Sequence, residues 1–343
     1  MQVLLGLRNF YQLRGNLNTA YELGQEVLNL ATSQDDTALL VQAHHAVAQT
    51  LLFKGILALA RDHAEQSLAL YNPQQHQTWV FRSGTGDLRV NSLATLSWIL
   101  GFLGYVDQSV TRINEALDIA RHLNHPFSLA IALAYATWVY RQREEPHRVH
   151  EPAEELMALA TKHGFRFQWA RGVFIQGWAR ARQGEGVEGI AQMHEGMAAM
   201  QETGTALGQT GWLLALADAY TQLHRLDEAH RFVTEALILA DKYDIRMSNS
   251  GLHPLMGEIL IKQHGITNCE EAEEHLCKAL TIARNQEAKL LELRAAMSLA
   301  RLWRQQGKRH EARELLAPVY AWFTEGFDTA DLQEARALLD TLA

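Results

Sequence analysis

The sequence predicts an all-α fold, a right-handed α-α superhelix of about eight helix-turn-helix repeats with a capping helix at the C-terminus. Three observations support this prediction. A short pattern recurs eight times in the 343 residues, mostly at a period of 40; apolar positions within each copy lie three and four residues apart; and glycine recurs between the two halves of most copies. A fixed period of this length is typical of a solenoid, in which neighbouring repeats bury a continuous core.

Each copy is predicted to form two helices separated by a tight turn. The position that marks a copy is mostly small: Ala20, Ala60, Ser109, Val149, Gly189, Ala229, Ala272 and Ala312. The positions four and seven residues later are mostly apolar and share one helical face. Five copies place glycine in the turn, where it can end a helix in the left-handed conformation: Gly15, Gly55, Gly104, Gly184 and Gly307. Asn18, Asp107 and Asp227 follow and are expected to cap the second helix.

We expect residues 1–343 to form a single elongated domain, because a repeat array grows without splitting its core. The expected repeat units are 1–40, 41–70, 90–128, 129–168, 169–208, 209–248, 250–291 and 292–326. An insertion loop is expected at 71–89, with Trp79 and Phe81 either folded over the concave face or packed as ordinary loop residues. A solvating capping helix is expected at 328–342, whereas the apolar N-terminal edge, including Leu4 and Leu5, is expected to meet an upstream domain, a further repeat or another subunit.

The pattern resembles the tetratricopeptide repeat (TPR), and the best match lies in the sixth copy. It runs through Leu213, Leu216, Ala217, Tyr220, Ala229, Val233 and Ala236. The period exceeds the usual 34 residues of that family, which implies longer helices. The segments "GKRHEARELLAPVYAWFTEGFDTADLQEARALL" and "RHLNHPFSLAIALA" look like the C-terminal TPR arrays of bacterial signalling proteins that carry a class III adenylate or guanylate cyclase and a STAND-type ATPase. This resemblance implies a regulatory or connecting role.

Composition and motifs argue against several functions. A net charge of -8 disfavours direct nucleic-acid binding, and no apolar run is long enough to span a membrane, so we expect a cytoplasmic protein. No G-x-x-x-x-G-K-[ST] or G-x-S-x-G motif occurs, and none of the 16 histidines belongs to a four-ligand metal pattern. We therefore expect no catalytic activity, cofactor or metal. Cys269 and Cys277 lie eight positions apart on one predicted helix and cannot form a disulfide.

A second periodicity is formed by tryptophan. Trp98, Trp138 and Trp178 occupy the same position on the first helix of three successive copies, where side chains of such repeats usually face the concave groove. Aromatic anchors with a polar rim can bind an amphipathic helix or an extended peptide. The predicted partner-binding groove comprises Trp98, Trp138, Trp178, Phe102, Phe174, Arg141, Arg171, Arg182 and Asp218, with the arginines placed to hold an acidic group.

Three interpretations of the tryptophans stay open at this point. They can fill the core between adjacent first helices, form a groove for a protein or peptide, or line a pocket for a small-molecule effector, as in the similar sensor arrays of STAND transcription regulators. The functional prediction is a non-catalytic interaction scaffold or regulatory module of a bacterial signalling system, with a small-molecule sensor as the alternative. Self-association through the N-terminal edge is a further expectation.

Overall fold

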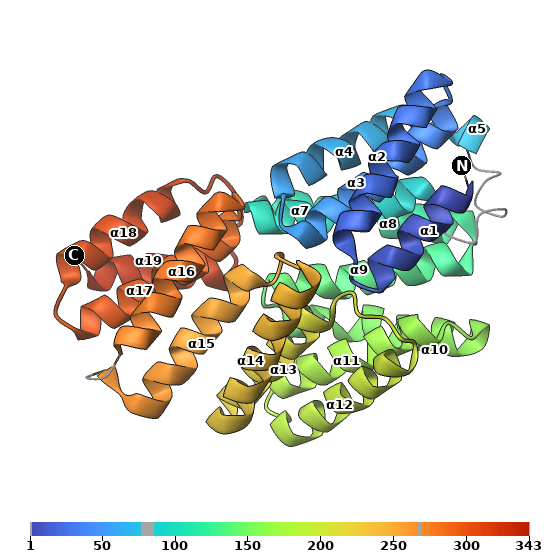
Figure 1. Ribbon diagram of the computed structural model, residues 1–343. Helices are drawn as coiled ribbons and strands as arrows, with labels where there is room; N and C mark the ends of the chain where they lie inside the picture. The colour runs from blue at the N-terminus through green and yellow to red at the C-terminus, as the bar shows by residue number, and fades with distance from the viewer. Residues whose placement is uncertain (1, 77–85, 267–268, 343) are drawn as a thin grey trace. The chain divides into compact units, whose positions relative to one another are not determined.

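The computed structural model describes residues 2–76, 86–266 and 269–342. Within these ranges every regular element is a helix, and consecutive helices pair through short turns (Figure 1). The chain divides into two compact units, which we call unit 1 (Met1–Leu100 and Gln108–Leu207) and unit 2 (Gly101–Asp107 and Gly208–Ala343). The described residues form the eight helix pairs and the final helix that the sequence predicts. The predicted loop residues Trp79 and Phe81 lie outside the described residues.

Unit 1 contains four complete helix pairs and most of one more, formed by α7 and α8, whose adjoining ends belong to unit 2. Its helices are α1 (Gln2–Leu13), α2 (Leu17–Ser33), α3 (Thr37–Lys54), α4 (Leu57–Leu70), the short α5 (Pro73–His76), α7 (Leu88–Leu103), α8 (Val106–Leu123), α9 (Pro126–Gln142), η2 (Pro146–Arg148), α10 (His150–His163), α11 (Arg166–Arg182) and α12 (Gly186–Glu202). The first and fifth pairs touch, since the Leu13 carbonyl accepts hydrogen bonds from the amides of Ala206 (2.8 Å) and Leu207 (3.2 Å).

Unit 2 contains three helix pairs and a last helix. They are α13 (Gln209–Gln222), α14 (Leu226–Tyr243), α15 (Asn249–His264), α16 (Glu270–Asn285), α17 (Lys289–Gln305), α18 (Arg309–Ala321) and α19 (Ala330–Thr341). Helix α19 buries Leu332, Ala335 and Leu338 in the core that α17 and α18 form. The Arg294 guanidinium of α17 donates two 2.8 Å hydrogen bonds to the Asp331 carboxylate and so fastens α19 to its neighbour.

The turns explain why the pattern has a fixed register. All five predicted turn glycines have positive φ, for example 73° at Gly55, which ends α3. Glu144 and His224 stand at the same offset in copies without glycine, and they adopt the same conformation (φ 56° and 55°). The repeat therefore requires a left-handed residue here even where the side chain makes it costly.

The predicted caps were wrong by two positions. Asn18, Asp107 and Asp227 lie inside the first turn of their helices, because α2, α8 and α14 begin one residue before them. Asn16, not Asn18, caps α2 and accepts a hydrogen bond from the Thr19 amide. Asp107 instead accepts a hydrogen bond from the Gly326 amide (2.9 Å).

First and second helices of unit 1 differ in how they are buried. Helix α2 buries one stripe, from Leu17 through Ala20 to Ala31, and leaves its other face to solvent. Helices α3, α9 and α11 instead bury residues around most of their circumference. These three first helices therefore supply much of the interior of unit 1.

At the N-terminal edge, α1 exposes a stripe of apolar side chains. Val3 is 74% exposed, Leu7 42% and Phe10 53%, whereas Leu5 packs into the core against α2 and α3. No helix among the described residues is long and apolar enough to cross a membrane. Both Cys269 and Cys277 have free thiols.

Candidate functional site

The three periodic tryptophans lie on neighbouring first helices of unit 1. Trp98 on α7 contacts Trp138 on α9 with ring centroids 6.0 Å apart, and it meets Phe53 on α3 edge to face at the same distance. The exposed fractions are 9% for Trp98, 6% for Trp138 and 0% for Trp178. The three rings are therefore largely covered by other described residues of unit 1.

Arg141 joins the second and third tryptophans. Its guanidinium carbon lies 5.1 Å from the ring centroid of Trp138 and 5.7 Å from that of Trp178. Both contacts are within the range of cation–π attraction. The 40-residue period thus brings together side chains from α7, α9 and α11, because equivalent positions on adjacent repeats share one face.

Tyr135 extends this aromatic row toward two further arginines. Its ring meets Trp98 edge to face at 5.7 Å, and the Arg171 guanidinium lies 5.5 Å from the same ring. Burial lowers the pKa of both the Arg8 and the Arg171 guanidinium, and the electrostatic influence of Tyr135 raises the pKa of each to a smaller extent. We call Arg8, Trp98, Tyr135, Trp138, Arg141, Arg171 and Trp178 the arginine–aromatic cluster.

Arg8 is the most unusual member of the cluster. The residue is only 2% exposed, and burial lowers the pKa of its guanidinium to about 9, so it still carries its charge at neutral pH. Nη1 donates to Asn9 Oδ1 (2.8 Å) and Gln49 Oε1 (3.3 Å), while Nη2 donates to Thr50 Oγ1 (2.9 Å) and to the Ala46 carbonyl. All four acceptors are uncharged. The buried Nε has no hydrogen-bond partner among the described residues.

Arg171 on α11 has fewer hydrogen-bond partners than Arg8. Within the described part of the chain its guanidinium donates one hydrogen bond, from Nη1 to Gln168 Oε1 (3.3 Å), and it packs against the rings of Tyr135 and Phe167. Burial lowers the pKa of Arg171 from its ordinary value. Arg171 is partly exposed, and like Arg8 it has no carboxylate hydrogen-bond partner among the described residues.

The remaining predicted site residues have other surroundings. Phe174 is fully buried and lies against Gly196 of α12, so it is a core residue. Arg182 forms a 2.6 Å ion pair with Glu144. Asp218 accepts hydrogen bonds from Gln222 on its own helix. Phe102 and Asp218 belong to unit 2, so the cluster in unit 1 includes neither.

Sequence reasoning missed Arg8 and Tyr135, although a clue to Arg8 is present in the sequence. Arg8 stands at the inter-helix contact position, which holds a small residue in the other seven copies: Ala48, Ser97, Thr137, Gly177, Ala217, Gly257 and Ala300. A large charged residue at a position that is otherwise small indicates a specific role. Tyr135 has no comparable clue, because its importance comes from contacts between distant repeats.

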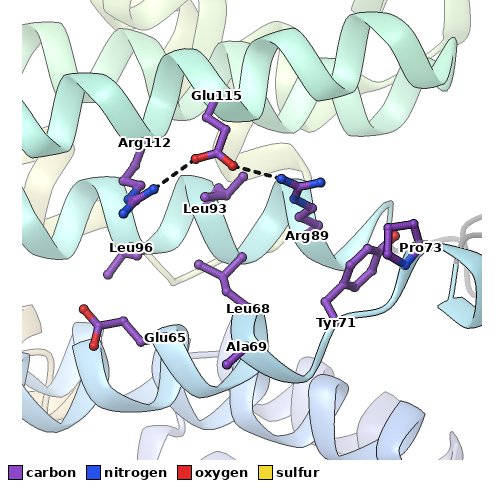
Figure 2. A pocket seen from close by; sticks show the side chains of 10 residues that line it. All are labelled: Glu65, Leu68, Ala69, Tyr71, Pro73, Arg89, Leu93, Leu96, Arg112 and Glu115. Atoms are coloured by element: carbon purple, nitrogen blue, oxygen red, sulfur yellow. Dashed lines mark hydrogen bonds and ion pairs between the residues drawn. The ribbon is translucent and has the colours of Figure 1, made fainter.

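A separate cavity of about 500 Å³ lies between α4, α7 and α8. Figure 2 shows Glu115 between Arg89 and Arg112 on one wall, with Glu65 on the facing helix. Glu115 pairs with Arg89 at 3.0 Å and with Arg112 at 3.1 Å, so both cations already have a carboxylate partner. The cavity is also bordered by Tyr71, whose pKa is raised by burial and by its 2.7 Å hydrogen bond to Asp87. Its polar groups are satisfied, and it makes a weaker candidate site than the cluster.

Among the described residues, no group of three or more His, Cys, Asp or Glu side chains is placed to hold a metal ion. Two histidine pairs do recur at equivalent repeat positions, with Nδ1 atoms 2.9 Å apart: His44 with His63, and His253 with His275. Burial is the main cause of a lowered pKa in all four rings. These pairs are therefore neutral at physiological pH, with one ring donating to the other.

Comparisons with known proteins identify the fold. No protein-family model matches the sequence, and no curated protein matches it. Similar solved structures include the Rap conjugation gene regulator of the plasmid pLS20 in complex with the Phr* peptide, with a TM-score of 0.63, 10% identity, and coverage of 100% of this chain and 97% of that one. A Rap protein complexed with competence and sporulation factor has a TM-score of 0.61, 12% identity and coverage of 99% and 96%.

A third similar structure is NprR in complex with its cognate peptide NprX. It has a TM-score of 0.55 and 12% identity, covering 88% of this chain and 82% of that one. Identities at this level establish the fold alone. The chain has the all-α, TPR-like helical-repeat fold of these proteins.

Proposed function

We propose that this protein is a non-catalytic module that binds a peptide or protein partner at the arginine–aromatic cluster of unit 1. The observation behind this proposal is a row of contacting aromatic rings flanked by arginines, of which Arg171 lies over the Tyr135 ring and Arg8 is 2% exposed with only uncharged hydrogen-bond acceptors. Aromatic and arginine side chains dominate binding energy at protein interfaces. Three solved structures of the same fold were determined with peptides bound, which agrees with this role by analogy.

More specifically, we propose that the chain is a regulatory or scaffold component of a bacterial signalling system in the cytoplasm. The resemblance of two segments to cyclase–STAND repeat arrays suggests this setting. Binding requires a small rearrangement, because Trp98 and Trp138 are 9% and 6% exposed. Such opening on binding is common among regulatory interactions.

The same burial supports a second candidate function, the sensing of a small-molecule effector. A ligand of a few heavy atoms needs less opening than a peptide to reach nearly buried rings. Both functions use the same cluster. They differ in what the protein selects from a mixture, so one selection experiment separates them.

A displayed library of random 12-residue peptides, selected on the intact protein, tests the peptide proposal. We expect enriched peptides that bind the intact protein and bind a Trp138→Leu variant at least about tenfold more weakly, a loss of about 1.4 kcal/mol. Trp212→Leu in unit 2 is the matched control, because Trp212 is 5% exposed and its substitution removes a similarly buried ring. Circular dichroism verifies that both variants fold.

The outcomes are distinct. Peptides that bind Trp138→Leu as well as the intact protein would place binding elsewhere. An absence of enriched peptides, together with stabilisation by a fraction of a metabolite mixture, would favour the effector sensor and reject the peptide proposal.

A further inference from the structure

Helix α1 exposes its more apolar face and buries its more polar one. Val3, Leu7 and Phe10 are 74%, 42% and 53% exposed, and their spacing of four and three residues places them on one face of the helix. The opposite face, which packs on α2 and α3, buries one apolar residue together with the polar Arg8 and Gln12. A helix that only packs on its own domain has the reverse pattern. The described residues therefore leave the more apolar face of α1 uncovered.

The last helix of unit 2 shows the ordinary arrangement. Helix α19 buries an apolar stripe and exposes Gln333, Glu334, Arg336 and Asp340. A terminal repeat of a solenoid normally has such a polar outer face, because an apolar one lowers solubility. The outer face of α1 departs from this pattern, and an exposed apolar patch on a soluble protein marks an interaction surface.

Gly6 lies within this exposed face and has no structural reason inside unit 1. It is exposed, and a Cβ atom at this position would have no neighbour within 4 Å. Glycine inside a helix is destabilising relative to alanine, and its use is to permit close approach. Gly177 of α11 is an example, because a Cβ atom there would lie 2.6 Å from the Gly189 carbonyl oxygen. No described residue approaches Gly6 in this way. We call Val3, Gly6, Leu7 and Phe10 the α1 stripe.

The α1 stripe is complementary in shape to a second copy of itself. Two α1 helices that cross antiparallel, with a two-fold axis between Gly6 and Leu7, form an isologous contact in which each copy offers the same residues. Leu7 then lies over Gly6 of the partner subunit, and Val3 lies opposite Phe10 of the partner subunit. A large side chain faces a small one twice, which lets the two helices approach closely.

The charges agree with such a partner. The α1 stripe contains no charged residue, and the sequence of α1 contains no acidic residue. Arg14 follows the helix, and its guanidinium carbon lies 5.6 Å from the centroid of the Phe10 ring at one end of the stripe. An uncharged surface of this kind fits an equally uncharged one better than it fits an acidic or a basic partner.

We infer that two copies of this protein associate through the α1 stripe, with their α1 helices antiparallel. This inference is independent of the proposed peptide-binding function. A single pair of crossing helices buries less than the roughly 1,200 Å² of a stable complex, so the dimer is weak, with a dissociation constant on the order of 10–100 μM. The protein is then monomeric in dilute solution.

Sedimentation velocity of the full-length protein measures this association. Over a range from about 5 to about 500 μM, we expect the average mass to rise from that of the monomer toward that of the dimer and no further, because an isologous contact closes after two copies. Continued growth beyond the dimer would reject the two-fold arrangement.

Gly6→Leu is the decisive variant. Unit 1 has room for the new side chain, which occupies the space that Leu7 of the partner subunit fills. We expect the dimer to weaken at least about tenfold, although the exposed apolar area increases. Nonspecific association of apolar surfaces predicts the opposite change. Leu7→Glu, which brings two like charges together near the axis, is expected to abolish the dimer, whereas the control Ile238→Glu, at a 63% exposed position on α14, leaves it unchanged. Circular dichroism verifies that each variant folds.

Cysteine crosslinking tests the antiparallel orientation. The exposed Cys277 is first replaced by serine, and Cys269 is buried. We expect Leu7→Cys to form a covalent dimer under mild oxidation. Val3→Cys is expected to remain monomeric, because antiparallel crossing separates the two copies of this position by about 10 Å along the helix axis, beyond the reach of about 7 Å between Cα atoms in a disulfide.

Three results would overturn the inference. The first is a monomer throughout the concentration range, which would mean that another chain, and not a second copy, covers the stripe or that nothing does. The second is unchanged or tighter association in Gly6→Leu. The third is crosslinking of Val3→Cys as readily as Leu7→Cys, which would indicate parallel or nonspecific contact.

Discussion

Substitution of Gly177 by alanine tests whether the close approach of α11 and α12 holds the cluster in place. A Cβ atom at this position would lie 2.6 Å from the Gly189 carbonyl oxygen and 2.8 Å from the Met193 amide nitrogen. Ordinary contacts of this kind exceed about 3.4 Å, so the two backbones must separate by most of an ångström. Helix α11 also bears Arg171 and Trp178, and its displacement would alter the cluster.

The expected change in the free energy of unfolding is the difference between two effects. Overpacking a well-packed core costs about 1–3 kcal/mol. Replacing a glycine inside a helix with alanine contributes about 1 kcal/mol in the opposite direction. Because both contacts of the new Cβ are with backbone atoms, which cannot rotate away, the upper part of the overpacking range applies. We expect Gly177→Ala to lower the free energy of unfolding by about 1–2 kcal/mol and Tm by several degrees.

Gly6→Ala is the control. Gly6 is an exposed position inside α1, and a Cβ atom there would have no neighbour within 4 Å. Only the helix-propensity gain applies, so this variant is expected to be as stable as the intact protein or more stable. Thermal unfolding followed by circular dichroism compares the two. Equal stabilisation by both substitutions would refute the argument from helix contact.

Three further predictions concern pH, capping and the last helix. Burial lowers the pKa of His45 to about 3 and that of His253 to about 4, so below about pH 6.5 the unfolded chain binds protons that the folded chain does not. The contribution of these two groups to stability is therefore constant above that pH and falls toward pH 4 by up to about 1.4 kcal/mol per pH unit for each group. Chemical unfolding at several pH values should show a weaker dependence of stability on pH in His253→Gln than in the intact protein. Asp36→Ala removes the side chain that accepts from the Leu39 amide at the start of α3, and a loss of about 1 kcal/mol is expected in urea unfolding; no change would mean that water replaces the cap. Asp331→Asn removes the charge that holds Arg294, so amide exchange in α19 should accelerate without a comparable change in unit 1.

Most of the fold could be predicted from sequence because its determinants are local and repeated. A small residue such as Ala60 permits two helices to approach, and a turn residue such as Gly55 sets where the first one ends. Each repeat contacts its neighbours in the same way, so a correct assignment of the helices in one repeat applies to all copies. The wrongly predicted caps show where local prediction ends. Asn16 and Asn18 are the same residue type and could each cap a helix, so only the exact start of α2 distinguishes them.

The cluster could be predicted only in part. The period brings Trp98 and Trp138 together because they are equivalent positions on adjacent first helices. The surroundings of α1, which bears Arg8, depend instead on the first repeat lying near the fifth, where Leu13 accepts hydrogen bonds from Ala206 and Leu207. That proximity depends on how far the repeats turn relative to one another, a sum of small rotations that a pattern of residue types does not encode.

The placement of Arg8 also links ligand binding to the attachment of α1. This helix buries only Leu5, Arg8 and Gln12, so little apolar area holds it to the rest of unit 1. Two of the three are polar, and both reach α3: Arg8 donates to Thr50, and Thr50 donates to Gln12 at 3.0 Å. An uncompensated charge at Arg8 weakens this attachment, because the folded position of α1 includes the cost of desolvating a guanidinium. A bound group that accepted a hydrogen bond from Arg8 Nε would offset part of that cost and hold α1 more firmly. The end of α1 also accepts the hydrogen bonds from Ala206 and Leu207. A ligand that contacted Arg8 would therefore change the stability of the contact between the first and fifth repeats, because binding shifts the population toward the state with α1 attached.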